Sequence, residues 1–197
     1  MNRSLSIAVA EDEPLMQQYL SETLALLGHQ VVCMVGTGRE LIDRCLALRP
    51  DLVMTDIRLP DMDGLDAATQ IYGVEPVPII VISAFHDPQL IERAERNHVL
   101  AYLVKPIKQH DLEPAIAIAM SRFHEFRAMR QEADNLRQAL EDRKLIERAK
   151  GLLMKRAGLD EPEAFRRLQK MARDKNQKLV EIAQIVITAE EVYQKGL

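Results

Sequence analysis

Short apolar runs alternate with helix-like stretches along the first half of the chain. The runs contain few polar residues, which is typical of parallel strands buried on both faces of a sheet. We predict five strands, at residues 6–10, 31–35, 52–56, 77–83 and 101–104. Helices are predicted at residues 14–27 and 38–48, after Gly64, and after Asp87 and Pro88. This alternation predicts the α/β class, with a doubly wound five-stranded parallel sheet.

The pattern becomes purely helical after Lys108. Residues 109–141 contain no glycine and one early proline, Pro114, so we predict one long helix there. Glycine and asparagine stop signals divide the remaining residues into helices, and Asp160 and Glu163 have the spacing of a capping box. We therefore predict an α/β domain at 1–120, a helical coiled-coil linker at 121–141 and a small all-α three-helix bundle at 142–197.

Apolar residues recur at sevens, threes and fours along the long helix. These residues, which we call the seam, are Ala119, Phe126, Met129, Ala133, Leu136 and Leu140. Such a seam predicts a short parallel coiled coil between two copies of the chain, so that the active form is a homodimer. The same residues can instead pack on the C-terminal helices of their own chain, and the sequence leaves both interpretations open.

The composition is that of an ordinary globular protein, with 197 residues, 47% hydrophobic and 28% charged. No apolar stretch approaches the length of a membrane span, and the first residues lack the apolar core of a signal peptide. We therefore expect a cytoplasmic protein. Cys33 and Cys45 lie in apolar surroundings without metal-ligand spacing, and we expect them to be buried free thiols.

Charge is distributed unevenly along the chain. Residues 1–120 carry nine Lys/Arg and seventeen Asp/Glu, a net charge of −8, whereas residues 121–197 carry seventeen and thirteen, a net charge of +4. Within the second part, residues 143–180 hold twelve Lys/Arg and five Asp/Glu, or +7. The asymmetry predicts two domains with different partners, and the basic segment is a candidate surface for an anion or a nucleic acid. A solvated helical face is the alternative interpretation of the same charge.

Four of the predicted strands end in polar residues, namely Glu11 and Asp12, Asp56, Ser83 and Lys105. A doubly wound sheet brings these strand ends to one crevice, so we expect the side chains to lie together. Three carboxylates repel one another unless a cation neutralises them, and a site with only oxygen ligands favours Mg²⁺. Lys105 and Ser83 could bind the oxygens of an incoming phosphoryl group, which predicts that Asp56 accepts that group as an acyl phosphate.

Each of these residues also has a simpler interpretation when it is taken alone. Asp56 could be a loop residue that bonds its own backbone, Ser83 could cap a turn, and Lys105 could be a solvated loop lysine. A hydrolase that uses Asp56 as its nucleophile is a remote alternative, because no second acid or base is positioned for it. We therefore predict that the protein is not an enzyme acting on a separate substrate.

The five residues, with Pro60, Gly64 and Pro106, resemble the receiver domain of two-component response regulators over residues 5–120. The resemblance implies a flavodoxin-like fold and a phosphoryl group supplied to Asp56 by a histidine kinase or another phosphodonor. It also implies that the receiver can catalyse its own phosphorylation and dephosphorylation, with Asp56, Ser83 and Lys105 as the catalytic residues.

The receiver resemblance implies further residue roles. Asp12, Asp56 and the backbone carbonyl of Arg58 would hold Mg²⁺ directly, while Glu11 would act through water. Ser83 and Tyr102 would form a switch pair. When Ser83 turns to the phosphoryl group, Tyr102 would move inward and reshape the surface around the last two strands.

The basic segment has a motif of its own, carried by Arg143, Ile146, Ala149, Lys150, Gly151, Leu153 and Met154 and followed by Ala164, Phe165, Leu168, Asn176, Leu179 and Ala183. Over residues 137–193 it resembles an ANTAR domain. The resemblance implies binding of RNA stem-loops in nascent transcripts and antitermination of transcription. The candidate RNA contacts, chosen for their place in or beside the motif, are Arg143, Arg148, Lys150, Lys155 and Arg156.

Gly151 is unexpected inside a helix, where glycine costs about 1 kcal/mol relative to alanine. Its presence predicts close packing or the close approach of a ligand backbone. Two alternatives to RNA binding remain for the C-terminal helices: they could bind DNA, as in many response regulators, or a protein partner.

Overall fold

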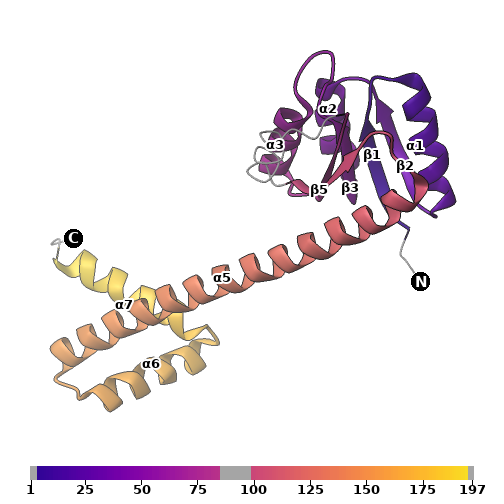
Figure 1. Cartoon of the computed structure of the whole chain (residues 1–197). Helices are drawn as coiled ribbons and strands as arrows, with labels where there is room; N and C mark the ends of the chain where they lie inside the picture. Colours follow the sequence, from indigo (N-terminus) through magenta and orange to yellow (C-terminus); the bar gives the residue numbers. More distant parts are fainter. Residues whose placement is uncertain (1–3, 85–98, 195–197) are drawn as a thin grey trace. The chain divides into compact units, whose positions relative to one another are not determined.

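The computed structural model describes residues 4–84 and 99–194 (Figure 1). Packing divides the chain into an α/β unit, residues 1–127, and a helical unit, residues 128–197. The long helix α5 (Gln109–Ala157) contributes residues to both units. The predicted domain limits at residues 120 and 141 fall within this helix and stay a prediction.

The α/β unit is built on a five-stranded parallel sheet with the order β2-β1-β3-β4-β5. The strands are β1 (Ser6–Ala10), β2 (Gln30–Val35), β3 (Leu52–Asp56), β4 (Ile79–Ser83) and β5 (Val99–Val104). Every residue of β3 and β4 is buried, which explains the continuous apolar runs in the sequence. Strand β3 lies between β1 and β4, so the acidic residues after β1 and β3 are brought to the same edge. The predicted doubly wound sheet is confirmed.

Helices cover both faces of this sheet. Helix α1 (Pro14–Leu26) and the first part of α5 pack on one face, where Ile7, Leu24 and Leu112 belong to one apolar cluster. Helices α2 (Gly38–Leu48) and α3 (Gly64–Val74) cover the other face, in a second cluster. The helix that we predicted after Asp87 and Pro88 lies outside the described residues.

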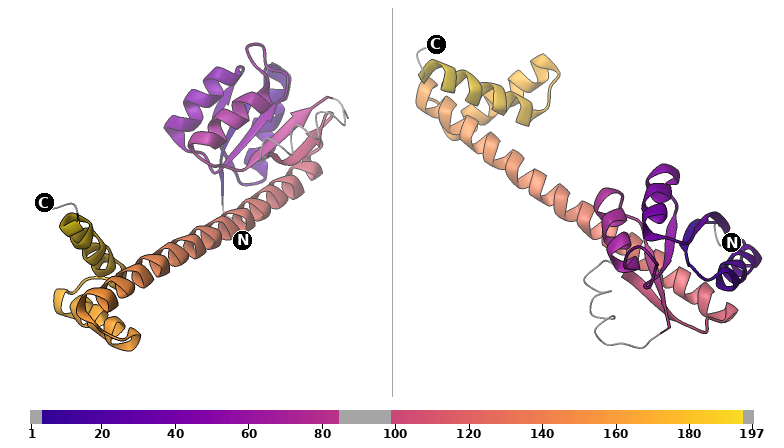
Figure 2. Two further views of the ribbon diagram at one scale, coloured as in Figure 1. Left: turned by 90° about the vertical axis from the view of Figure 1, so that its left-hand side faces the viewer. Right: turned by 90° about the horizontal axis from the view of Figure 1, so that it is seen from above.

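The helical unit consists of the last part of α5, α6 (Glu161–Lys175) and α7 (Leu179–Gln194), seen from two further sides in Figure 2. The predicted capping box is confirmed, since Asp160 and Glu163 exchange both hydrogen bonds. The predicted linker and the first helix of the bundle form one unbroken helix. The small core of this unit includes Ala149, Leu168, Ala172, Ile182, Ala183 and Ile187.

The seam divides into two parts in the structure. Ala119 is fully buried and belongs to the core of the α/β unit, so its assignment to the seam is corrected. Met129, Leu136 and Leu140 are 59–62% exposed, and Phe126 is 40% exposed. Within the described residues the chain's own C-terminal helices do not cover these side chains.

Two other predictions concern the whole chain. Cys33 and Cys45 are free thiols, but only Cys45 is buried and Cys33 is half-buried; burial raises the pKa of Cys45 to about 12. Among the helices that the structure describes, none combines the length and the apolar character needed to cross a membrane.

His29 is a buried histidine just before β2, at the amino-terminal edge of the sheet. It is 8% exposed, and its Nδ1 accepts a hydrogen bond from the N–H of Leu5 at 3.3 Å. A nitrogen that accepts carries no proton, so the folded state holds a neutral ring. Burial lowers the pKa of His29 from its usual value of 6.5, while the charge of Glu113 acts in the opposite direction.

We expect His29 to make the α/β unit less stable as the pH falls below about 6.5. The unfolded state takes up a proton in this range before the folded state does, and each unit of lowered pKa costs about 1.4 kcal/mol once both states are protonated. His29→Gln keeps an acceptor but does not titrate, so its free energy of unfolding should change less between about pH 7 and about pH 5. Urea unfolding measures the change, with His110→Gln at an exposed site as the control. An unaltered pH dependence in His29→Gln would contradict the assignment.

Candidate functional site

An acidic cluster lies at the carboxyl-terminal edge of the sheet. Glu11 and Asp12 follow β1, and Asp56 is the last residue of β3. One carboxylate oxygen from each of the three lies within 4.8 Å of the others. Glu11 and Asp56 are buried, whereas Asp12 is exposed. The structure therefore brings together the acidic residues that the sequence predicted.

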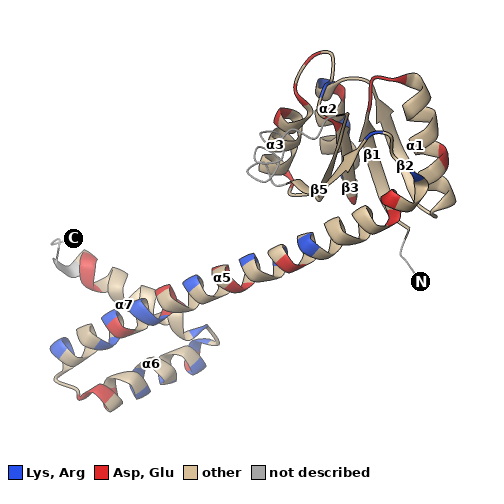
Figure 3. Cartoon of the chain, viewed as in Figure 1, with Lys and Arg blue, Asp and Glu red and all other residues tan. Residues whose placement is uncertain are grey.

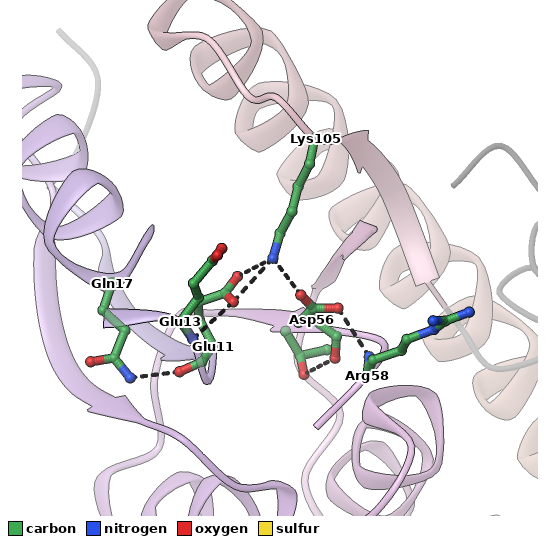
Figure 4. A network of polar contacts seen from close by, with 7 residues as sticks. Glu11, Glu13, Gln17, Asp56, Arg58 and Lys105 are labelled. Carbon is green, nitrogen blue, oxygen red and sulfur yellow. Dashed lines mark hydrogen bonds and ion pairs between the residues drawn. The ribbon is translucent and has the colours of Figure 1, made fainter. Parts of the chain in front are cut away.

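Lys105 points its ammonium group between two of these carboxylates (Figure 4). Its Nζ lies 2.5 Å from Asp56 Oδ2 and 2.8 Å from Glu11 Oε2. The residue follows β5, and its backbone N–H donates to the carbonyl of Ser83 at 2.8 Å. The end of β4 therefore fixes the position from which the lysine reaches the acidic cluster.

The electrostatics of the cluster follow from its burial. Burial raises the pKa of Glu11, and the negative charge of Asp56 adds to the effect, while Lys105 opposes it. Burial alone would lower the pKa of Lys105, but its hydrogen bonds to Asp56 and Glu11 outweigh this and the pKa is raised. The Lys105 ammonium thus favours the ionised form of Glu11, against the effect of burial, and stays charged itself.

The cluster fits a divalent cation. Oε2 of Glu11 is a buried acceptor that receives no hydrogen bond, although the Lys105 ammonium lies within ion-pair distance. Three carboxylates facing one ammonium leave an excess of negative charge. All the candidate ligands are oxygen atoms, and such a set favours a hard ion such as Mg²⁺ over a transition metal.

The loop after β3 holds Asp56 in place. Its Oδ1 accepts a hydrogen bond from the backbone N–H of Arg58 at 3.0 Å, and the side chain of Arg58 is exposed. Asp63 caps α3 by accepting the N–H of Leu65, and the N–H of Gly64 donates to the carbonyl of Ile57 at 2.7 Å. These bonds turn the chain back towards the acceptor residue.

Gly64→Ala is expected to destabilise the α/β unit by about 1–3 kcal/mol, the usual cost of overpacking. A Cβ at this position would overlap the carbonyl oxygen of Asp56 and press on Oγ1 of Thr55, so the backbone of the loop has to move. Gly73→Ala is the matched control, because a Cβ there meets nothing within 4 Å and alanine favours a helix by up to about 1 kcal/mol. Chemical denaturation should give opposite signs for the two variants; a neutral Gly64→Ala would show that the loop tolerates a side chain.

Asp61 was not singled out in the sequence. Its two carboxylate oxygens accept the N–H groups of Gly38 and Arg39 at 2.8 and 3.0 Å, at the start of α2. These backbone hydrogen bonds, the one from Arg39 first, lower the pKa of Asp61. The contact ties the loop after Asp56 to a neighbouring helix. No local pattern indicates it, because the partner lies far away in the sequence.

The predicted switch residues lie on adjacent strands. Ser83 is buried at the end of β4, and Tyr102 is half-buried on β5. Tyr102 also lines a hollow of about 540 Å³ along β5 and the start of α5. The two residues thus lie on neighbouring strands, and their role as a switch pair stays a prediction.

Lys150, one of the predicted RNA contacts, forms ion pairs within the helical unit. It is 8% exposed, and its Nζ lies 2.6 Å from Glu147 Oε2 and 2.7 Å from Glu161 Oε1. The hydrogen bonds to Glu147 and Glu161 raise the pKa of Lys150. Glu161 is in the first turn of α6, so the lysine ties α6 to α5. Both partner carboxylates belong to exposed side chains, so the predicted RNA contact of Lys150 stays a prediction.

The other predicted RNA contacts fall into two groups. Arg148 is ion-paired with Glu191 and Arg156 with Glu190. Arg143 and Lys155 are exposed, and neither forms an ion pair with any residue that the structure describes. Basic residues in the helical unit thus differ in the charge that is available to a partner.

Two family models match the chain. The receiver domain of response regulators matches residues 7–117, and the ANTAR domain matches residues 134–187. The first match lies in the α/β unit and the second in the helical unit. Both resemblances drawn from the sequence motifs are confirmed.

Similarity to individual proteins supports the assignment of these two domains. The chain is 41% identical over 181 residues to the transcriptional regulatory protein PdtaR of Mycobacterium tuberculosis, a match that covers 92% of this chain and 88% of that protein. It is 29% identical over 103 residues to the chemotaxis protein CheY of Thermotoga maritima, covering 52% of this chain and 86% of that protein. The solved signal receiver domain of a modulated diguanylate cyclase from Desulfovibrio desulfuricans G20 matches with a TM-score of 0.58 and 28% identity, over 62% of this chain and 98% of that one.

Proposed function

Because the chain belongs to the response regulators that join a receiver domain to an ANTAR domain, we propose that it is a phosphorylation-controlled transcription antiterminator. The observation that carries the proposal is that the same chain contains a buried Asp56 in contact with Lys105 and a separate, basic helical unit. We propose that it acts in the cytoplasm on RNA stem-loops of nascent transcripts. A histidine kinase or another phosphodonor supplies the signal.

The phosphoryl-transfer step belongs to Asp56. A carboxylate oxygen of Asp56 attacks the phosphorus of the donor, a bond to that oxygen forms, and the donor's leaving group departs with its electron pair. Lys105, which lies against Asp56 and Glu11, moves its charge to the phosphoryl oxygens. Ser83 at the end of β4 offers a hydroxyl group to the same oxygens. Through these residues the receiver catalyses its own phosphorylation and dephosphorylation, without acting on a separate substrate.

The metal site contributes charge compensation. Asp12, Asp56 and the carbonyl of Arg58 would hold Mg²⁺ directly, and Glu11 would act through water. Bound there, the ion would offset the negative charge of the carboxylates and of the phosphoryl group. The three carboxylates around one ammonium support this assignment, because they leave an excess of negative charge that a cation would neutralise.

The output step requires RNA binding by the helical unit. Residues 143–180 carry a net charge of +7, which suits a polyanion, and there is no aromatic platform of the kind used by single-strand readers. Phosphate contacts and the shape of the stem-loop should therefore dominate recognition. The exposed seam of α5 supports association of two chains, so that a homodimer engages two stem-loops at once.

The test is binding of the full chain to an RNA that carries two stem-loops, with and without beryllofluoride and Mg²⁺, while the mass in solution is followed. We expect tighter RNA binding and a shift to dimer when the phosphoryl mimic is present. A response to beryllofluoride without any RNA binding would keep the receiver and reject antitermination. Duplex DNA is included as a competitor, and preference for it would favour the DNA-binding alternative.

A further inference from the structure

Gly151 has no structural explanation within the described part of the chain. It lies inside α5, which continues to Ala157, so it does not end the helix. It is not among the glycines with positive φ, which are Gly28 and Gly158. A Cβ at Gly151 would meet nothing within 4 Å, and the position is exposed. Packing and backbone conformation would both allow alanine, which stabilises a helix interior more than glycine does.

Basic residues surround this glycine on the same side of α5. Lys144, Arg148 and Lys155 lie at i−7, i−3 and i+4 relative to Gly151, which places them on one helix face. We call these four residues the Gly151 face; all four are exposed (Figure 3 shows the charges along α5). The face lies on the side away from Ala149 and Leu153, two residues through which α5 enters the core of the helical unit.

The charges of the Gly151 face are available to a partner. Lys155 forms no ion pair with the described residues. Lys144 and Arg148 pair with Glu141 and Glu191 at exposed positions, where ion pairs are weak and a phosphate can replace the carboxylate. The acidic neighbour Glu147 is engaged by Lys150 at 2.6 Å, which offsets its repulsion of an anion. This contact of Lys150 with Glu147 helps to keep the Gly151 face basic.

Building on the proposed RNA binding, we propose that the Gly151 face is the surface that receives the sugar-phosphate backbone of the stem-loop. The missing side chain at Gly151 lets the RNA chain approach the helix axis more closely than any other residue would allow. Lys155 and Arg148, one turn away on either side, then bind phosphates that flank the point of closest approach. A nucleic-acid backbone combines both requirements, since it is narrow and carries a negative charge at each nucleotide.

Helix α6 offers a rival surface. Arg166, Lys170 and Arg173 lie at i, i+4 and i+7 on the side opposite Leu168, and they form no ion pairs with the residues that the structure describes. This surface carries positive charge, but α6 has no glycine at which a ligand could approach the helix closely. A basic helix face without such a glycine is often only a solvated surface. Gly151, by contrast, destabilises its helix, and a function such as ligand binding would account for its presence.

The test compares Gly151→Ala and Gly151→Gln with the wild-type full chain, using a fluorescent RNA with two stem-loops and thermal unfolding. Both substitutions favour the helix, so the melting temperature should rise or stay the same. RNA affinity should nevertheless fall, by about tenfold or more for glutamine and by less for alanine. Lys155→Gln should reduce the slope of log K against log salt by about one unit, the effect of one lost phosphate contact.

Controls separate the possible outcomes. Ala139→Gln adds the same side chain to an exposed position on another face of α5 and should leave RNA binding unchanged. Wild-type affinity in Gly151→Gln overturns the proposal. If affinity is lost instead on replacing Arg166, Lys170 and Arg173 by glutamine, the RNA surface is on α6. Absence of RNA binding by the wild type, even at low salt, would reject the proposed function itself.

Discussion

Asp56→Asn is expected to abolish formation of the acyl phosphate while leaving the α/β unit folded. The asparagine amide has no nucleophilic carboxylate oxygen. In the acidic cluster only Asp56 lies at the end of β3, where its Oδ2 is 2.5 Å from Lys105 Nζ. The fold should tolerate the change, because it removes the negative charge of Asp56, which raises the pKa of Glu11. Intact mass after incubation with a small phosphodonor and Mg²⁺ measures the modification.

Asp61→Asn provides the matched control for the acceptor. Asp61 belongs to the loop after β3, but its oxygens face Gly38 and Arg39 at the start of α2. An asparagine can still accept these hydrogen bonds, so phosphorylation should persist in this variant. Phosphorylation of Asp56→Asn at the wild-type level would assign the acceptor to another residue and reject the proposed chemistry.

The sheet and its site were predictable because strong local patterns specify them. Strands β3 and β4 are buried throughout, so their sequences are continuous apolar runs that end at a definite polar residue. Once the strands are known to be parallel, Glu11, Asp56 and Lys105 must lie at the same edge. The parallel sheet confirms that premise, and the contacts of Lys105 follow from it.

Other features depend on tertiary contacts that a sequence does not display. The ion pair between Lys150 and Glu161 was not predicted, because Glu161 comes within reach only when α6 folds back on α5. Ala119 fits the heptad spacing of the seam, yet its small side chain is buried in the α/β unit. A heptad pattern predicts which face of a helix is apolar, but it does not predict which partner covers that face. Residues of one periodic pattern can therefore pack against different partners.

Replacing Leu136 and Leu140 by glutamate is expected to keep the protein monomeric and to weaken binding to an RNA with two stem-loops. Both leucines are about 60% exposed on α5, and burying a leucine in an interface contributes about 1.5–3 kcal/mol. Two glutamates in the same seam would repel their counterparts in a second chain. Loss of bivalent engagement should lower the apparent affinity by roughly 10²-fold to 10⁴-fold.

A second RNA and a second variant test whether this effect is specific to the seam. An RNA with a single stem-loop needs one helical unit, so its affinity for the Leu136→Glu, Leu140→Glu variant should equal that of the wild type. Gln131→Glu with Gln138→Glu adds the same charge on the opposite side of the heptad and should still form dimers. Sedimentation in the presence of beryllofluoride reports the oligomeric state. A seam variant that remains dimeric and binds the two-stem RNA normally would show that α5 does not join the chains, and the homodimer would then require a different surface.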